Sequence, residues 1–377
     1  MPLRGATLAL GLMLVCLTLA ASSAHAAPED FVEACSNGIA VPDPEDNPDL
    51  VQDCAILLSI RDTLAGDATL DWSAEVPVAK WEGLLVDHWI GRVVLLQLND
   101  RGLTGVVPPE LGRLSGLSDL YLGDNRLTGE IPTELGELAR LHTLGLWGNQ
   151  LTGEIPPELG RLSGLSDLYL GDNRLTGEIP IELAALVELH NLELSSNQLT
   201  GEIPPELDRL WRLKGLYLSD NRLTGQIPTQ LGALADLQVL GLRANRLTGE
   251  IPPELGLLSN LELLYLSDNQ LTGEIPTELG ELAHLQTLGL WGNQLIGKIP
   301  PELGRLTNLE SLWLFSNELT GDIPPELGDL PNLQMLVLFG NRLTGCIPAK
   351  LRTIESNDLD LLDLPDCPEP APGDTGT

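Results

Sequence analysis

A repeat of 24 residues constrains the fold of this chain more than any other feature of its sequence. From Val93 to Ser356 the pattern L-x-x-L-x-L-x-x-N-x-L-T-G-x-I-P-x-x-L-G-x-L-x-x occurs eleven times in direct succession. A fixed period of this length indicates a solenoid, in which each repeat forms one coil and buries its apolar side chains against the neighbouring coils. The length of 377 residues therefore does not imply several compact domains.

The segment L-x-L predicts one short strand in every repeat. In the copy that starts at Leu117, Leu120 and Leu122 point into the core, whereas Tyr121 and Gly123 face outward, because side chains alternate between the two faces of a strand. Stacked coils align these strands in a parallel sheet on the concave side. The pattern is typical of the leucine-rich repeat, and we expect an α/β solenoid, a right-handed superhelix that is capped at both ends.

Three other columns of the repeat have expected structural roles. The asparagines, from Asn125 to Asn341, can donate and accept hydrogen bonds, so they can satisfy backbone groups in a tight turn. The glycines, one in each copy, permit a turn that a Cβ atom would hinder. The prolines that follow three residues later restrict the path of the chain on the outer side.

The segments beside the repeats predict caps. Residues 27–92 are expected to form the N-terminal cap, with a helix that begins at Asn47 and ends near Gly66. Three tryptophans of this segment are expected to cover the open core of the first repeat: Trp72, Trp81 and Trp89. Residues 357–377 are expected to form the C-terminal cap and a disordered tail, because the sequence from Pro365 onward is rich in proline and acidic residues.

Residues 1–26 have the composition of a secretory signal peptide. Arg4 supplies the positive start, residues 6–20 are apolar, and Ala24, His25 and Ala26 form a cleavage pattern. No later stretch approaches the roughly 20 apolar residues of a membrane span. The sequence thus predicts a secreted, extracellular chain, which would associate with a membrane only through a membrane-bound partner.

Four cysteines remain after residue 26, one pair before the repeats and one pair after them. In an exported chain such pairs indicate disulfides. Three connectivities exist, and the separation of the pairs by the whole repeat array favours Cys35 with Cys54 and Cys346 with Cys367. A metal site is the alternative, and it is disfavoured because no histidine lies near either pair with ligand spacing.

Charge and the remaining polar residues exclude several function classes. The net charge of −33 disfavours a nucleic-acid partner, which requires clustered lysines and arginines. The histidines have no serine, cysteine or metal partner at a recognisable spacing, and carboxylates are too widespread to identify a catalytic pair. We therefore expect no enzymatic activity, no catalytic residue, no cofactor and no metal ion.

The aromatic residues indicate a binding surface. Of 14 aromatic residues, nine occupy the two outward positions of the predicted strands, and exposed aromatic surface usually marks a contact site. An arginine lies in the same outward columns. The predicted ligand-binding residues are Tyr121, Trp147, Tyr169, Tyr217, Arg243, Tyr265, Trp291, Trp313, Phe315 and Phe339.

Five of these rings, the four tyrosines and Trp313, recur in every second repeat. Strands about 4.8 Å apart would place them about 10 Å apart, a spacing that suits sugar rings or apolar protein side chains. Gly145 and Gly289 would leave room for Trp147 and Trp291. Alternatively, the period records only duplication, because residues 108–132 are identical to residues 156–180. The residues that break the copied pattern escape this objection: Arg243, Trp313, Phe315 and Phe339.

The element L-T-G-x-I-P within a 24-residue unit resembles the plant-type extracellular leucine-rich repeat of receptor-kinase ectodomains and polygalacturonase-inhibiting proteins. Residues 54–58, 81–83 and 91–93 look like the N-terminal cap of that family. The resemblance covers about residues 50–367 and implies a binding scaffold. The chain departs from the family in two respects: no cysteine follows Trp81-Glu82-Gly83, and there is no N-x-[ST] sequon.

We therefore expect a secreted, non-catalytic recognition module that binds an extracellular protein or glycan on the concave face of its sheet. The alternative is a structural or adhesive cell-surface component that self-associates through its acidic faces.

Overall fold

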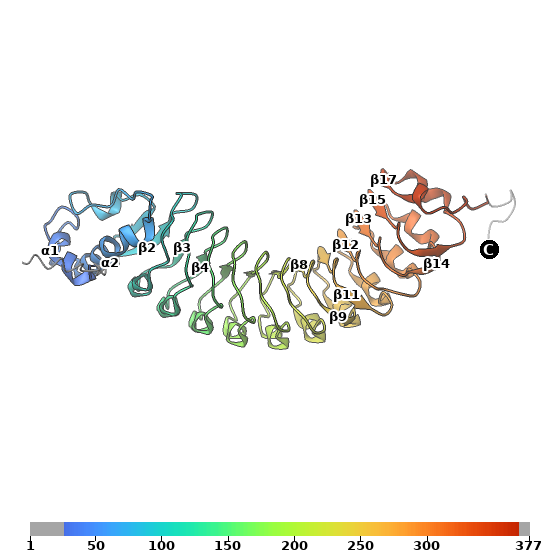
Figure 1. Cartoon of the computed structure of the whole chain (residues 1–377), viewed down its shortest axis with the longest axis horizontal. Helices are drawn as coiled ribbons and strands as arrows, with labels where there is room; N and C mark the ends of the chain where they lie inside the picture. The colour runs from blue at the N-terminus through green and yellow to red at the C-terminus, as the bar shows by residue number, and fades with distance from the viewer. Residues whose placement is uncertain (1–25, 369–377) are drawn as a thin grey trace, which may run out of the picture.

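The computed structural model describes residues 26–368 and shows an open arc of stacked coils (Figure 1). The two caps lie at opposite ends of the arc, and the coils between them follow one another in sequence order. Each coil contributes a strand to the concave side and a helical turn to the convex side. The predicted signal peptide lies, except for Ala26, outside the described residues.

The concave side is one sheet of 13 strands. From β2 onward all neighbours are parallel and pair in register, for example Leu120 with Leu144 and Leu168, so the leucines of successive coils meet in rows. In spatial order the strands are β1 (Leu84–Asp87), β2 (Arg92–Gln97), β3 (Asp119–Tyr121), β4 (Thr143–Gly145), β5 (Asp167–Tyr169), β6 (Asn191–Glu193), β7 (Gly215–Tyr217), β8 (Val239–Gly241), β10 (Leu263–Tyr265), β12 (Thr287–Gly289), β13 (Ser311–Trp313), β15 (Met335–Val337) and β17 (Ser356–Asn357).

The first strand departs from the predicted parallel sheet. Strand β1 pairs with β2 in the antiparallel direction. Only residues 88–91 connect the two strands, and so short a connection cannot carry the chain back to the start of a parallel neighbour. The cap thus covers the first edge of the sheet with a hairpin.

Two smaller pairs of parallel strands lie where the T-G element of neighbouring coils meets: β9 (Thr248–Glu250) with β11 (Gln270–Thr272), and β14 (Thr320–Asp322) with β16 (Arg342–Thr344). The convex side consists of short 3-10 turns, because a proline starts each one and the next leucine ends it after about one turn. These turns are η3 (Pro109–Arg113), η4 (Thr133–Glu137), η5 (Pro157–Arg161), η6 (Ile181–Ala185), η7 (Pro205–Arg209), η8 (Thr229–Ala233), η9 (Pro253–Leu257), η10 (Thr277–Glu281), η11 (Pro301–Arg305), η12 (Pro325–Asp329) and η13 (Ala349–Thr353).

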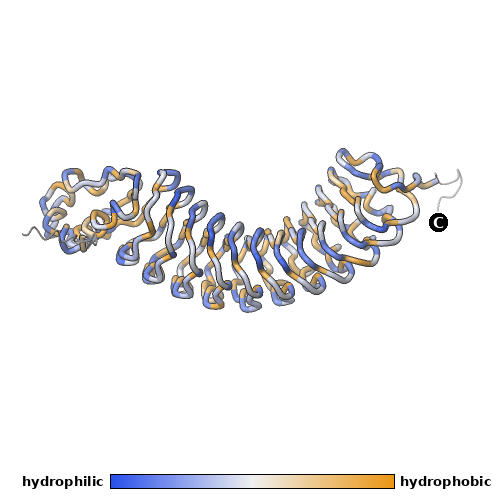
Figure 2. Tube along the Cα trace, viewed as in Figure 1, coloured by the Kyte–Doolittle hydropathy of each residue, from blue (hydrophilic) through white to orange (hydrophobic). Residues whose placement is uncertain are grey.

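The repeat leucines form one continuous core. Leu120 and Leu122, together with their equivalents in the neighbouring coils, are fully buried. Hydrophobic segments accordingly recur in every coil of the chain trace (Figure 2). A single apolar cluster runs from the N-terminal cap to Leu359, so no coil has a core of its own. Stability in such an array is shared between nearest neighbours.

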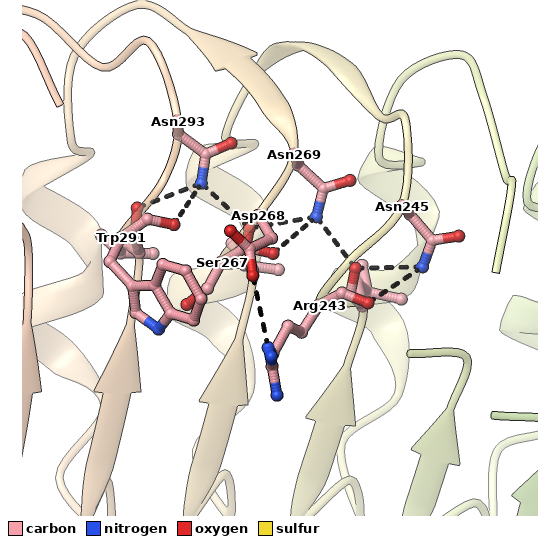
Figure 3. A network of polar contacts seen from close by, with 10 residues as sticks. Arg243, Asn245, Ser267, Asp268, Asn269, Trp291 and Asn293 are labelled. Atoms are coloured by element: carbon pink, nitrogen blue, oxygen red, sulfur yellow. Dashed lines mark hydrogen bonds and ion pairs between the residues drawn. The ribbon is translucent and has the colours of Figure 1, made fainter. Parts of the chain in front are cut away.

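The asparagine column connects each coil to the one before it. The Asn269 amide donates to the carbonyl oxygens of Leu242, Leu266 and Ser267, and its Oδ1 atom accepts the backbone N–H of Leu247. Asn245 and Asn293 donate in the same way (Figure 3). The column thus satisfies buried backbone groups of two coils at once, as the sequence predicts.

The residue before each of these asparagines has a positive φ angle. Examples are Asp124 at 53°, Asp268 at 52° and Gly148 at 64°. Aspartate and glycine tolerate this left-handed conformation better than other residues do. The aspartates of this column therefore have a backbone role besides their charge. Ala244, at a φ of 53°, lacks any such preference.

We predict that Ala244→Gly stabilises the protein by about 1 kcal/mol, because glycine removes the steric cost of a Cβ atom at positive φ. Thermal unfolding of the two proteins measures the difference. The matched control is Ala233→Gly on the exposed turn η8, where φ is not positive and glycine should destabilise. Equal shifts of Tm in both variants would refute the conformational explanation.

The N-terminal cap is built around one long helix. After η1 (Pro28–Phe31) and α1 (Val32–Cys35), helix α2 (Pro48–Ala65) begins and ends as predicted, with Asn47 and Gly66 as its capping residues. Asp53 of α2 is fully buried and accepts hydrogen bonds from the Arg92 guanidinium and the Val93 N–H at the start of β2. These bonds join the cap to the first coil.

Two of the three cap tryptophans behave as expected. Trp72 and Trp81 are buried and stack with ring centroids 5.9 Å apart, beside η2 (Val78–Lys80). The third, Trp89, does not cover the core: it is 99% exposed. Trp89 lies in the short connection between β1 and β2, residues 88–91, and not in a strand or helix that packs on the core.

Both disulfides form with the predicted pairing, Cys35 with Cys54 and Cys346 with Cys367. The second one closes the C-terminal cap, which also contains η14 (Leu359–Leu361). Ile347 donates its N–H to the Pro365 carbonyl and accepts the Cys367 N–H. Residues 365–367 therefore belong to the cap, and the rest of the expected tail, from residue 369, lies outside the described residues.

Among residues 26–368 no helix has the length and apolar character needed to cross a membrane.

Candidate functional site

All nine outward aromatic residues lie on the concave sheet. The four tyrosines and Trp313 end their strands, and the other rings follow two residues later. The backbone ladder continues to these later positions, as in the bond from the Asp124 N–H to the Trp147 carbonyl, so both columns face the same way. The rings gather in an N-terminal group and a C-terminal group, with Tyr217 between them.

Three rings of the C-terminal group form one stack, which we call the C-terminal stack: Trp291, Phe315 and Phe339. The centroids of Trp291 and Phe315 are 4.9 Å apart, and those of Phe315 and Phe339 are 5.0 Å apart. Their planes differ by only 8° and 11°. Neighbouring rings therefore cover each other's faces, and mainly their edges remain for a ligand.

Arg243 closes one end of this stack. Its guanidinium carbon lies 5.3 Å from the centroid of the Trp291 ring, within the range of a cation–π interaction. The same guanidinium forms an ion pair of 3.6 Å with Asp268 (Figure 3). The structure thus places the predicted Arg243 beside the stack and adds Asp268, which is not among the predicted ligand-binding residues.

Tyr265 and Trp313 form a second contact in the C-terminal group. Their centroids are 6.4 Å apart, which contradicts the spacing of about 10 Å predicted for this column. Gly289 explains the difference, because it lies between the two strands and has no side chain to hold the rings apart. Gly289 therefore accommodates Tyr265 and Trp313 rather than Trp291. The Trp313 indole also donates to the Met335 sulfur at 2.9 Å.

The N-terminal group has a different geometry. Trp147 lies 6.3 Å from Tyr121 and 6.0 Å from Tyr169, centroid to centroid, and both tyrosines are nearly perpendicular to it, at 75° and 82°. A Cβ atom at Gly123 or Gly145 would collide with the indole, so the ring lies against these two glycines. The sequence predicted room for the Trp147 ring at Gly145, and the structure adds Gly123.

Tyr217 pairs with no other ring among the described residues, because Glu193 lies next to it on β6 and its own ring lies over Gly215. The Glu193 carboxylate accepts the Ser195 N–H, and burial raises the pKa of this carboxyl. Glu193 thus separates Tyr217 from the N-terminal group.

Tyr169 is the most perturbed phenol of the sheet. Burial, and then the charge of Asp167 and the hydrogen bond donated to it, raise the pKa of Tyr169 to about 12. Because this value exceeds that of the unfolded chain, the contribution of Tyr169 to stability is complete below pH 10 and is lost as the pH rises through 12.

We predict that a spectrophotometric titration shows one phenol ionising near pH 12, and that Tyr169→Phe removes this component. Asp167→Asn should move it to lower pH, since the neighbouring negative charge is gone. Circular dichroism in the same titration monitors folding. A Tyr169 that is fully ionised at pH 10 in the folded protein would contradict this assignment.

Sequence reasoning missed part of this surface. Val239, Leu263, Met335 and Val337 also face outward from the C-terminal strands, where most other coils carry polar residues or tyrosine. The sequence could have shown them, because they are apolar residues at positions of the repeat that face outward. Within residues 26–368 no group of three histidine, cysteine or acidic residues is arranged to hold a metal ion.

Comparisons with known proteins agree with this architecture. The family model described as Leucine Rich Repeat matches residues 116–138, 140–162, 164–186, 188–210, 212–234 and 236–258. The model for two copies of the repeat matches residues 259–304, and a further leucine-rich-repeat model matches residues 283–343.

Several individual proteins that resemble this chain are plant receptors. The receptor-like kinase TMK2 of Arabidopsis thaliana is 34% identical over 80 residues, which are 21% of this chain and 8% of that protein. The plant peptide hormone receptor RGFR1, solved with RGF2, is 35% identical, with a TM-score of 0.64 over 70% of this chain and 47% of its own.

The ectodomain of GASSHO1/SCHENGEN3 from Arabidopsis thaliana, solved with CASPARIAN STRIP INTEGRITY FACTOR 2, is 38% identical. Its TM-score is 0.67 over 87% of this chain and 41% of its own. The chain thus spans less than half the length of these receptor structures. The repeat models and these structures together show that the chain belongs to the leucine-rich-repeat family, in its plant-type extracellular form.

Proposed function

We propose that this chain is a secreted, non-catalytic recognition module that holds a segment of an extracellular protein against its concave sheet. The observation that carries the proposal is the gathering of nine aromatic side chains, with Arg243, on that one face. Aromatic residues and arginine are enriched where proteins bind one another.

The geometry of the C-terminal stack favours a protein over a glycan at that part of the surface. A sugar needs the open face of an aromatic ring. In the C-terminal stack both faces of Trp291 and of Phe315 are covered by neighbouring rings or by Arg243, and only the outer face of Phe339 stays open. The exposed ring edges, with Val337 and Met335 beside Trp313, form an apolar ridge suited to the side chains of a protein.

The similar structures supply independent support. One is a plant peptide hormone receptor solved in complex with RGF2, and another is a receptor-kinase ectodomain solved in complex with CASPARIAN STRIP INTEGRITY FACTOR 2. The chain covers less than half of either structure, so the ligands of those receptors are not assigned to it. The class of its own ligand is inferred from the chemistry of its concave face.

We predict that Phe339→Ala weakens binding of the partner about 30-fold, because a ring at the centre of a contact is worth about 2 kcal/mol. Phe339 suits this test because it ends the stack and is 37% exposed. The partner is first captured from a library of extracellular proteins, with a glycan array in parallel, and its affinity is then measured by calorimetry. Trp313→Ala should have an effect of similar size.

Trp211→Ala is the matched control. This tryptophan is 52% exposed but lies outside the strands, on the segment between η7 and β7, with Arg212 over its ring. Its removal should leave the affinity unchanged. Binding that survives Phe339→Ala and Trp313→Ala, or capture of glycans alone, would overturn the proposal. Light scattering distinguishes the self-associating alternative, which requires oligomers in the absence of a partner.

A further inference from the structure

Trp147 and Trp291 each lie in the coil that follows a coil with an outward tyrosine, and the two segments that contain them are duplicates. Residues 133–151 recur as residues 277–295, with changes only at Arg140 and His142. Trp147 therefore corresponds to Trp291, and in the coil before each of them Asp124 corresponds to Asp268 and Tyr121 to Tyr265. The same side chains are thus present at both ends of the concave sheet, although Trp291 stacks on Phe315 whereas Trp147 lies against Gly123 and Gly145.

In the C-terminal copy a guanidinium lies among these side chains. Arg243 lies over the Trp291 ring at 5.3 Å and forms an ion pair with Asp268 at 3.6 Å (Figure 3). In this copy Trp291 and Asp268 thus hold a cation together. The interaction combines attraction to the ring with attraction to the carboxylate.

In the N-terminal copy no arginine or lysine among residues 26–368 lies over the Trp147 ring. The residue that corresponds to Arg243 is Asn99, whose Oδ1 atom accepts the Gly123 N–H at 2.7 Å. The residue that corresponds to Phe315 is Gly171, so no ring stacks on Trp147 from the following coil. With its inner side against Gly123 and Gly145, the indole presents its outer face to solvent between Tyr121 and Tyr169.

The charges around Trp147 suit a cation. The Trp147 N–H donates to the Asp124 carboxylate at 3.1 Å, and this bond to an anion makes the indole ring more electron-rich. Asp119 and Asp167 lie two residues before the flanking tyrosines. Arg126 and Arg174 come directly after Asn125 and Asn173, so they lie at the rim and not in the columns that carry the aromatic rings. The pattern resembles the aromatic cages that recognise alkylated ammonium groups.

We propose a binding site for a guanidinium or ammonium group of the partner, formed by Trp147, Asp124, Tyr121 and Tyr169. This group would bind Trp147 as the guanidinium of Arg243 binds Trp291. The proposal rests on the proposed function in one respect: the cation belongs to a side chain of the bound protein segment. That segment would carry an arginine or lysine toward the N-terminal coils and apolar residues toward the C-terminal stack.

The test uses a small probe and needs no partner. The indole N–H signals of the ¹⁵N-labelled mature chain are recorded by NMR, and the signal of Trp147 is assigned with Trp147→Phe. Acetyl-arginine amide should shift this signal saturably at millimolar concentration, and the matched neutral probe, acetyl-citrulline amide, should not. Asp124→Asn should weaken the binding of the arginine probe about fivefold.

Exchange variants sharpen the test. Asn99→Arg should supply the cation from within the chain and abolish the response of Trp147, whereas the neutral control Asn99→Gln should preserve it. Conversely, Arg243→Gln should open the second site, so that the arginine probe now shifts Trp291. Equal shifts with both probes, or a response of Trp147 that survives Asn99→Arg, would overturn the proposal. Failure of the proposed function would instead appear as partner binding that is indifferent to Phe339→Ala.

Discussion

Replacing Asn221 with leucine should lower the free energy of unfolding by about 3 kcal/mol, because leucine has the size but not the hydrogen bonds of the amide. The Asn221 amide donates to the carbonyls of Leu194, Leu218 and Ser219, and its Oδ1 atom accepts the Leu199 N–H at 3.0 Å. A buried donor left without a partner costs about 1–3 kcal/mol, and several buried groups lose their partner here. Denaturant unfolding measures the total effect.

The damage should also be local. Coils contact only their neighbours, so hydrogen exchange of the Leu199 amide should accelerate more than that of amides near either cap. Asn260→Ala is the control, since this exposed side chain makes one bond, to the Ala235 carbonyl. Its cost should stay below about 1 kcal/mol. Similar losses in both variants would show that the buried column has no special role.

Asp53→Asn should destabilise the N-terminal cap by about 3–5 kcal/mol, because it leaves the half-buried Arg92 guanidinium with only the exposed and more distant Asp49, at 3.8 Å, as a counter-charge. The Asp53 carboxylate is fully buried and receives two bonds from Arg92, of 2.9 and 2.7 Å, and a third from the Val93 N–H. These bonds connect α2 to β2, so their loss should uncover the core of the first coil. Thermal unfolding and exchange of the β2 amides measure the effect.

Two variants test the reason for this loss. Burial raises the pKa of Asp53 despite the hydrogen bonds from Arg92 and Val93, so desolvation opposes the attraction within the pair. Replacing both partners, Asp53→Leu with Arg92→Met, should therefore recover most of the stability that the single variant loses. Asp62→Asn, in the exposed pair with Arg61, should cost less than about 0.5 kcal/mol. A double variant as unstable as the single one would contradict this explanation.

The repeat determined most of the fold in advance, because its leucines and asparagines act within one coil or between adjacent coils. The strand at Leu120, the helix that ends at Gly66 and both disulfides follow from spacing alone. The antiparallel β1 and the exposed Trp89 could not be predicted in this way, because the cap occurs once and provides no repeated pattern.

The composition of the concave surface was predictable, but the orientation of its rings was not. Each ring adjusts to residues in the coils on both sides. Gly289 allows Tyr265 and Trp313 to approach, and Phe315 holds Trp291 in the stack, whereas Gly171 leaves the corresponding side of Trp147 open. The binding role of these rings stays a prediction.

The most direct measurement of that role is hydroxyl-radical footprinting of the aromatic side chains, with and without the captured partner. If the partner binds the concave sheet, oxidation of Trp313, Phe315 and Phe339 should fall severalfold, while that of Trp89 and Trp211 should not change. Protection of Trp89 or Trp211, with the concave rings oxidised as in the free protein, would contradict the proposal that this face is the binding surface.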